Sequence, residues 1–445
     1  MKIRRKMKAY HIIQLLLLLC AVSLNVEAQE IDHDKITFTV TLDRDNPDYK
    51  PGEPMKFTFK VDFGEQAPPE KNYSVFWVRS GDDGIRKSGE FTVVPGKAEE
   101  VVVSTDKPGF VRLEAWLRDS ERKNIPVTFR KGNHAVKRQK AFDGGAGVEI
   151  FSLKQAVAEP ADFDAFWTRQ KARLNKVPLK YTLNEVAMPD KDFKQYAVTI
   201  DCAGPRPVTG YLVIPAKAKD KSLDAIVSYH GYGTGAQKPF VKAWRNAIYF
   251  SVNAHGYELG KDQQYYKDFA ASIRSGKHNY AFDPAQNADP EKAYFNGMAM
   301  RVMRSLQFVK SLPAWNGMNL KVEGGSQGGM QSIWGASLDS QVNEARVNDP
   351  WCADVGGVTV KRLNGWRPSY VPGLNYYDII NHAKRIGKHC KVTIVKSGLG
   401  DYVCPPSGVT SLYNSIIAPK EIVYYQGSDH GFSLPGGQTF KVKAK

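Results

Sequence analysis

A serine set among glycines is the residue pattern in this sequence that most directly suggests chemistry. Residues 324–329 read Gly-Gly-Ser-Gln-Gly-Gly and match G-x-S-x-G around Ser326. A predicted strand at 320–323 comes directly before the pattern, and a predicted helix follows it. In a nucleophile elbow the serine is held at strained backbone angles, and glycines beside it avoid clashes with the strand and the helix. We therefore predict that Ser326 is a catalytic nucleophile and not part of an ordinary glycine-rich turn.

A serine hydroxyl becomes a strong nucleophile when a base removes its proton, and an acid must orient that base. His430 follows the last predicted strand, where a loop can carry its ring over the serine, whereas His382 and His389 stand in a helical stretch. Asp401 ends a predicted strand at the carboxyl edge of the sheet, where open α/β folds build their sites. We predict His430 as the base and Asp401 as the acid. The other candidate acids are Asp349, Asp354 and Asp378. Asp429 is not favoured, because the direct neighbour of a histidine rarely aims its carboxylate at the ring Nδ1.

Acyl transfer through a serine also needs N–H donors for the developing oxyanion. The backbone N–H of Gln327, the residue after the nucleophile, is predicted as one donor. The N–H of Tyr232 is predicted as the second, because Tyr-His-Gly-Tyr-Gly at 229–233 follows an early predicted strand. The glycines at 231–235 lack the G-x-G-x-x-G spacing and the later acidic partner of a dinucleotide site, so phosphate binding is not favoured.

The second part of the chain has the pattern of a scaffold for these residues. From residue 150 to 445, predicted strands alternate with predicted helices, which indicates a largely parallel sheet covered by helices on both faces. Strands are predicted at 196–201, 209–214, 225–229, 248–252, 320–323, 392–397 and 422–425. The order serine, acid, histidine along the chain is that of an α/β-hydrolase. We predict this fold for residues 150–445.

The first part of the chain has an all-β pattern. Between residues 36 and 126, segments alternate apolar and polar residues with period two, and clusters of glycine and proline separate them. About seven short strands fit an immunoglobulin-like sandwich, which we predict for residues 31–130, with a linker at 131–149. No cluster of catalytic type falls within the sandwich, so we expect it to contribute positioning or stability.

Composition and charge exclude several classes of protein. With 445 residues, 42% hydrophobic and 24% charged, the chain suits two or three globular domains. Part of its net charge of +16 belongs to the basic N-terminus. The rest is scattered and forms no basic stripe interleaved with aromatic residues, so we expect no nucleic-acid partner.

The first 28 residues have the pattern of a signal peptide. A basic N-terminal region, a short apolar run and a cleavage site at Val-Glu-Ala indicate removal of this segment and export to the periplasm or the extracellular medium. The run is too short for a membrane-spanning helix, so we expect no stable membrane insertion after cleavage. A lipid-modification site usually has a small residue directly before its cysteine. Leu19 occupies this position before Cys20, so a lipoprotein is not expected.

The four cysteines beyond the signal peptide show no CxxC pairing, which argues against a zinc site. We predict no metal and no cofactor. Cys390 and Cys404 are the nearest pair, and an exported location permits a disulfide between them. Free, buried cysteines are the alternative.

These motifs together resemble the acetyl xylan esterase and cephalosporin C deacetylase family of α/β-hydrolases. The resemblance covers about residues 160–435 and is carried by Asp-Phe-Asp-Ala-Phe-Trp at 162–167, His-Gly-Tyr at 230–232, Gly-Ser-Gln-Gly-Gly at 325–329, Gly-Leu-Gly-Asp at 398–401 and Cys-Pro-Pro-Ser at 404–407. It implies a serine esterase that removes acetyl groups from sugars, an oxyanion hole at Tyr232 and Gln327, and no metal.

Two positions depart from the pattern of that family. Asn-Ala-His-Gly at 253–256 stands where the family usually carries Arg-Gly-Gln, and Gly431 stands where a glutamate usually follows the histidine. His255 and Tyr257 are candidate substrate-binding residues, with a structural, hydrogen-bonded role as the alternative for His255. The expected partners are an acetylated oligo- or polysaccharide or small acetyl esters, and a homo-oligomer is left open. The competing hypotheses are a general carboxylesterase, a serine peptidase of α/β-hydrolase type and a non-enzymatic carbohydrate-binding protein.

Overall fold

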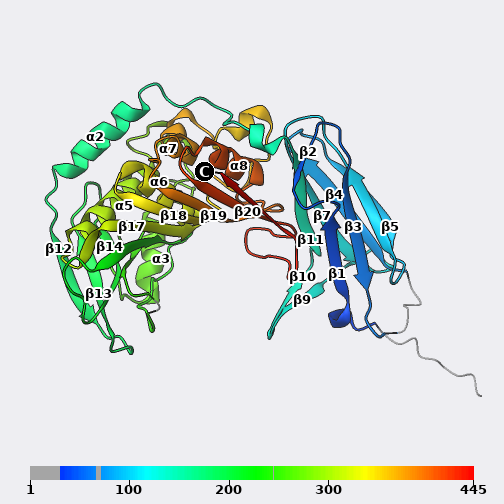
Figure 1. The fold of residues 1–445 in the computed structure, drawn as a ribbon, viewed down its shortest axis with the longest axis horizontal. Coiled ribbons are helices and arrows are strands. Elements are labelled where there is room, and N and C mark those ends of the chain that lie inside the picture. Colours follow the sequence, from blue (N-terminus) through cyan, green and yellow to red (C-terminus); the bar gives the residue numbers. More distant parts are fainter. Residues whose placement is uncertain (1–30, 67–71, 244, 445) are drawn as a thin grey trace, which may run out of the picture.

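The chain folds into an all-β part and a sheet-and-helix part that lie side by side (Figure 1). The structure is a computed structural model, and it describes residues 31–66, 72–243 and 245–444. The predicted signal peptide at 1–28 and Cys20 lie outside these residues. Within them, no helix has both the length and the apolar character that crossing a bilayer requires.

Two larger sheets and a two-stranded sheet of β9 and β10 form the N-terminal part. The larger sheets have the orders β1-β3-β6 and β2-β11-β7-β4-β5, with β8 paired to β7. Strands β1 and β3 bury every second residue, as expected for strands with one face on a core. Phe59 of β3 meets Phe142 of β11 and Phe91 of β5 at ring-centroid distances of 5.9 and 5.8 Å, so the two sheets share a core. The strands are β1 (Thr37–Leu42), β2 (Asp48–Tyr49), β3 (Met55–Asp62), β4 (Ser74–Gly81), β5 (Lys87–Thr92), β6 (Ala98–Val103), β7 (Gly109–Arg118), β8 (Asn124–Ile125), β9 (Val127–Lys131), β10 (His134–Arg138) and β11 (Phe142–Val148).

Residues 131–149, predicted as a linker, instead carry two strands of the N-terminal part. Strand β10 pairs with β9 in a hairpin, and β11 lies between β2 and β7 with all seven residues buried. The three glycines of β11 suggested a linker because glycine is depleted in strands. Here a Cβ at Gly145 would overlap the carbonyl oxygen of Val111, so the glycine permits a close backbone approach. The N-terminal part therefore extends to Val148.

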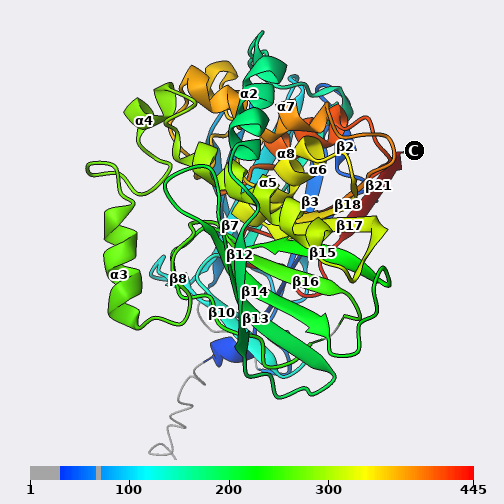
Figure 2. The ribbon, with the colours of Figure 1, turned by 90° about the vertical axis from the view of Figure 1, so that its left-hand side faces the viewer.

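A ten-stranded sheet forms the centre of the second part, in the order β12-β13-β14-β16-β15-β17-β18-β19-β20-β21. Strands β15 to β20 are parallel to one another, whereas β12 to β14 at one edge and β21 at the other are antiparallel. Figure 2 shows the β12–β14 edge facing the viewer. The strands are β12 (Tyr181–Val186), β13 (Phe193–Ile200), β14 (Val208–Pro215), β15 (Leu223–Tyr229), β16 (Ile248–Asn253), β17 (Trp315–Gly325), β18 (Val342–Asn348), β19 (Lys391–Gly398), β20 (Lys420–Tyr425) and β21 (Thr439–Ala444).

Helices pack on this sheet, as the alternating pattern of the sequence predicts. Helix α6 contacts β15, β17 and β18, and α5 packs against α6. Most residues of both helices are buried, because each lies between the sheet and other elements. The helices are α2 (Phe163–Asn175), α3 (Gln263–Ser272), α4 (Pro284–Ala288), α5 (Tyr294–Ser311), α6 (Gln327–Leu338), α7 (Ile379–Ala383) and α8 (Pro406–Ser415), with short 3-10 turns η1 (His33–Lys35), η2 (Ile150–Ser152), η3 (Gly357–Val360) and η4 (Pro372–Tyr376).

Hydrogen bonds to backbone groups join the two parts. The Gln426 side chain, directly after β20, accepts from the Gly145 N–H at 2.9 Å and donates to the Gly145 oxygen at 2.8 Å. Asp82 of the N-terminal part accepts from the Leu363 N–H at 2.9 Å. Because Gln426 completes both hydrogen bonds of one strand residue, β11 is fixed against the end of β20.

Candidate active site

Ser326 stands at a sharp turn between strand β17 and helix α6. Its backbone angles, φ 54° and ψ −119°, are strained for a residue with a side chain. A Cβ at Gly324 would lie 2.5 Å from the Gly328 carbonyl carbon, and a Cβ at Gly328 would overlap the Tyr229 oxygen of β15. The glycines are therefore required by the close approach of strand and helix, which is the physical reason that the sequence pattern was interpreted as an elbow.

His430 and Asp401 form a hydrogen-bonded pair on loops that follow β20 and β19. The His430 Nδ1 lies 2.9 Å from the Asp401 Oδ2. The other carboxylate oxygen, Oδ1, accepts from the N–H groups of Val403 and Cys404 at 2.7 and 2.8 Å, so the acid is oriented by its own turn. The Asp401 side chain is fully buried, whereas that of His430 is one-quarter exposed. The pair thus presents an imidazole held by a carboxylate.

The charge of Asp401 sets the protonation of His430. Burial alone would lower the pKa of His430, but the hydrogen bond to Asp401 and its negative charge outweigh burial and raise the pKa above its ordinary value. The second carboxylate, Asp349, adds to this rise. His430 is therefore a stronger base than a free imidazole and is better able to take a proton from a hydroxyl.

The sheet brings the predicted catalytic residues to one edge. Strands β17, β18, β19 and β20 are neighbours and run parallel, so their carboxyl ends lie together. Ser326 directly follows β17, Asp401 follows β19 by three residues, and His430 follows β20 by five. Open α/β sheets place their sites at this edge.

The turn that carries Tyr232 is bonded to the residue after the serine through Tyr280. The Tyr232 ring stacks on Tyr280 at 4.2 Å, and the Gly233 N–H donates to the Tyr280 hydroxyl at 2.9 Å. That hydroxyl donates to the Gln327 Oε1 at 2.9 Å. Gln327 is the first residue of α6, where backbone N–H groups have no acceptor within the helix. The two predicted oxyanion donors thus belong to elements that one tyrosine joins. No sequence motif pointed to Tyr280.

His255 and Tyr257 lie beneath this turn, and both are buried. The His255 Nε2 lies 2.9 Å from the Gly233 oxygen, and its Nδ1 lies 2.9 Å from the Tyr294 hydroxyl. Tyr257 donates to the Gly235 oxygen at 2.7 Å. Burial lowers the pKa of His255 well below its ordinary value, so the ring is neutral. These bonds fit the structural role that the sequence left open for His255, and they give Tyr257 the same role of supporting the turn.

Asp349 and Lys396 form a second buried ion pair beside His430. Asp349 follows β18 with φ 40°, and its Oδ1 accepts from the Gly398 N–H at 3.0 Å. Lys396 Nζ lies 3.0 Å from the Asp349 Oδ2 and donates to the Asp429 oxygen at 2.9 Å. Burial, together with the charge of Asp401, raises the pKa of Asp349 to about 6. The pair therefore connects the strand before the acid with the loop that carries the histidine. The sequence offered Asp349 as a candidate acid but gave no sign of this connection.

The N-terminal part reaches the same loops. Arg138 of β10 pairs with the Asp429 carboxylate, and its guanidinium carbon lies 4.2 Å from the centre of the Phe432 ring. Arg112 of β7 holds Asp143 through two hydrogen bonds of 2.8 and 2.6 Å. A Cβ at Gly400 would overlap the Asp143 oxygen, so the acid turn packs directly on β11.

The four described cysteines are free, so Cys390 and Cys404 form no disulfide. Asp401, Cys404 and His430 have ligand-type atoms within 4.8 Å of one another. Burial raises the pKa of the Cys404 thiol well above its ordinary value. The other two residues, Asp401 and His430, lie close together because they are hydrogen-bonded to each other.

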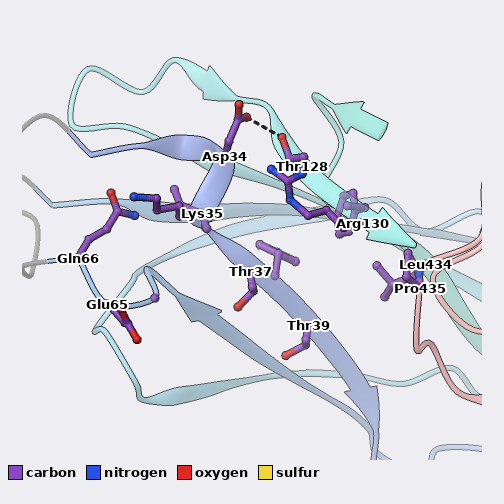
Figure 3. Close-up of a pocket in the computed structure, with 14 residues that line it drawn as sticks. Asp34, Lys35, Thr37, Thr39, Glu65, Gln66, Thr128, Arg130, Leu434 and Pro435 are labelled. Carbon is purple, nitrogen blue, oxygen red and sulfur yellow. Dashed lines mark hydrogen bonds between the residues drawn. The ribbon is translucent and has the colours of Figure 1, made fainter. Parts of the chain in front are cut away.

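An open groove of about 760 Å³ lies on the N-terminal part, where the loop at Leu434 and Pro435 meets it (Figure 3). Its labelled side chains are mainly polar, and Thr128 donates a hydrogen bond to Asp34 at 2.7 Å. None of the predicted catalytic residues is among those that line it. The candidate active site is therefore defined by the sheet edge and not by this groove.

Comparison with known proteins shows which proteins this chain is similar to. The family model for acetyl xylan esterase (AXE1) matches residues 148–365 and 367–443. The chain is 26% identical over 399 residues to the acetyl esterase Axe7A of Xylanibacter ruminicola, covering 86% of this chain and 84% of that protein.

Solved structures show the same fold for the second part. An acetyl xylan esterase from Paenibacillus sp. R4 is 26% identical with a TM-score of 0.51, covering 64% of this chain and 94% of its own. Acetyl xylan esterase 1 from Thermoanaerobacterium sp. JW/SL YS485 is 21% identical with a TM-score of 0.54, covering 64% and 93%. The resemblance found in the sequence is confirmed, as is the α/β-hydrolase type of the second part. The chain belongs to the acetyl xylan esterase family and is a carboxylic ester hydrolase, an acetylesterase.

Proposed function

We propose that this protein is an exported serine esterase that removes acetyl groups from acetylated carbohydrate through a triad of Ser326, His430 and Asp401. The observation that carries the triad is the 2.9 Å bond between His430 and Asp401, at the sheet edge where the strained Ser326 also stands. Family membership and the acetyl esterases among its relatives support an acetyl ester as the substrate.

In the proposed mechanism, neutral His430 takes the hydroxyl proton of Ser326 as its oxygen attacks the acetyl carbonyl carbon. Asp401 accepts the Nδ1–H bond and stabilises the imidazolium that forms. The N–H groups of Gln327 and Tyr232 donate to the oxyanion. His430 then gives its proton to the sugar oxygen as the bond from that oxygen to the acetyl carbon breaks, which releases the sugar hydroxyl and leaves an acetylated Ser326. Water activated by His430 hydrolyses this acyl-enzyme and releases acetate.

The same proposal covers export and the N-terminal part. The signal-peptide pattern of the first 28 residues supports export to the periplasm or the extracellular medium. Two packed sheets of mostly antiparallel strands support an immunoglobulin-like class for the N-terminal part.

The test is acetate release from acetylated xylan by the wild-type enzyme and by Ser326→Ala. The wild type should release acetate, and the folded variant should lose activity by a factor on the order of 10⁴ or more. Circular dichroism confirms that the variant is folded. A folded Ser326→Ala variant with more than about a tenth of wild-type activity would show that another group is the nucleophile.

A general carboxylesterase is the second candidate, and an acyl-length series separates it from a deacetylase. Each extra methylene adds about 0.8 kcal/mol of binding in a roomy apolar pocket but clashes in a closed one. The kcat/KM values for p-nitrophenyl esters should be highest for acetate and fall steeply by butyrate. A maximum at six or more carbons would favour the general carboxylesterase.

A further inference from the structure

Two exposed aromatic side chains lie beside the catalytic acid. Of the aromatic residues in the described parts of the chain, four are at least 40% exposed. Tyr181 lies on the edge strand β12, and Phe151 lies in η2. The other two, Trp366 and Tyr402, are 41% and 52% exposed. Tyr402 is the neighbour of Asp401 in the chain, and the Trp366 N–H donates to the oxygen of the next residue, Val403, at 3.3 Å.

Trp366 is held rigidly between the acid turn and the proposed oxyanion turn. Its indole meets the Tyr232 ring edge to face at 4.8 Å and stacks on Trp351 at 5.6 Å. The Trp351 Nε1 donates to the Trp366 oxygen at 2.6 Å. Trp366 is therefore an exposed ring fixed by contacts on both sides of the site, unlike an exposed apolar residue on a surface strand.

Tyr402 is placed by the N-terminal part of the chain. The guanidinium of Arg112 lies 5.7 Å from the centre of the Tyr402 ring, and Asp143 holds that guanidinium by two hydrogen bonds. The ring thus stands where the acid turn meets β7 and β11, with half of its surface open.

We propose that Trp366 and Tyr402 form a stacking platform for the pyranose rings of the carbohydrate chain whose acetyl group is removed at Ser326. This inference rests on the proposed function. A sugar ring has an apolar C–H face and a polar rim, and rigid tryptophan and tyrosine rings offer a large amphipathic contact area at low entropic cost. Small acetate esters have no chain of pyranose rings that could stack on the platform. The platform therefore contributes binding energy that depends on the non-reacting part of the substrate.

The test compares two substrates across four variants. The ratio of kcat/KM for an acetylated xylo-oligosaccharide to kcat/KM for p-nitrophenyl acetate is measured for Trp366→Ala, Trp366→Phe, Tyr402→Ala and Tyr181→Ala. Each alanine variant at the platform should lower this ratio about three- to tenfold, mainly through KM of the oligosaccharide. Trp366→Phe should recover most of the ratio because it keeps a flat ring. Tyr181→Ala removes a tyrosine that is 40% exposed and lies far along the sheet, so it should leave the ratio unchanged.

A binding measurement without turnover completes the test. In the Ser326→Ala background, unacetylated xylo-oligosaccharide should quench tryptophan fluorescence, and the Trp366→Ala substitution should weaken the titrated affinity. If Trp366→Ala lowers activity on both substrates equally, Trp366 only supports the Tyr232 turn and the platform is refuted.

An unchanged ratio in both alanine variants refutes the platform while the proposed function stands. A wild type that cleaves p-nitrophenyl acetate but releases no acetate from the oligosaccharide refutes the carbohydrate substrate, and the platform with it.

Discussion

Two buried aspartates follow neighbouring strands beside His430, and their side chains have different partners. The Asp401 Oδ2 faces the imidazole, whereas the Asp349 carboxylate faces Lys396 and the Gly398 N–H. Asp401→Asn should lower kcat by a factor on the order of 10⁴ with little change in KM, because asparagine favours the wrong tautomer and cannot stabilise the imidazolium. Asp349→Asn should cost far less. Steady-state kinetics on p-nitrophenyl acetate measures both, and the reverse order would show that Asp349 is the acid.

The pH profile should report the charge of Asp349. Activity requires neutral His430, so kcat/KM rises with pH as His430 loses its proton. The negative charge of Asp349 helps to raise the pKa of His430. Asp349→Asn removes this charge, lowers that pKa, and should therefore move the acid limb of the profile to lower pH. Asp339→Asn, which breaks the partly buried Lys310–Asp339 pair at the far end of α6, is the control and should leave the limb in place. A shift to higher pH in Asp349→Asn would contradict the assignment.

The proposed catalytic residues could be singled out from the sequence, whereas the residues that support them could not. Ser326 and Asp401 stand in local patterns, a strand followed by a glycine-bearing turn, that chain order is enough to interpret. The contact of Asp349 with Lys396 arises because β18 pairs with β19. The register between two strands cannot be predicted from the sequence of either strand alone. Tyr280 reaches the site from a loop between α3 and α4, for which no periodicity exists.

At the scale of elements, the approach of α6 to β15 and β17 determines the shape of the elbow. Gly328→Ala places a Cβ on the Tyr229 oxygen, where only backbone could move, so the variant should lose about 3 kcal/mol of stability and roughly 5–10 °C in Tm. Gly335→Ala in the same helix is the matched control. A Cβ there meets side chains at 3.4 Å or more, so Tm should stay within about 3 °C of wild type. Equal losses in the two variants, measured by thermal unfolding, would show that the elbow has no special need for glycine.

Seven strands of the second part were predicted, but the central strand β18, the edge strands β12 and β21, and strand β11 were not. Runs of buried apolar residues identify β15, β17 and β19, because parallel strands are covered on both faces. Strand β12 has exposed side chains at five of its six positions and gives no such signal. The glycines of β11 conceal its strand character in the sequence. They permit close approach to the backbone of Val111 and Leu399, which only the folded chain brings near.

At the scale of the whole molecule, Arg138 links the N-terminal part to the loop that carries His430, and we expect the loss of this link to lower kcat. It fixes Asp429, the residue before His430, from the N-terminal part. Arg138→Ala should lower kcat several-fold with a smaller effect on KM, because the histidine loop loses its outer support while the substrate contacts remain. Lys137→Ala on the same strand removes an exposed pair with Asp34 and serves as the control. Wild-type kcat in a folded Arg138→Ala variant would show that the loop that carries His430 keeps its position without Arg138.

The double hydrogen bond between Gln426 and Gly145 has a consequence for how the protein opens. Strand β11 belongs to one sheet and Gln426 extends another, so neither sheet can come apart at this point without exposing polar groups of both. Amide hydrogens of β11 and β20 should therefore exchange with solvent deuterium at matching rates, as one cooperative unit that spans the two sheets. A protease that nicks the chain between β11 and α2 would then leave both fragments attached and the enzyme active.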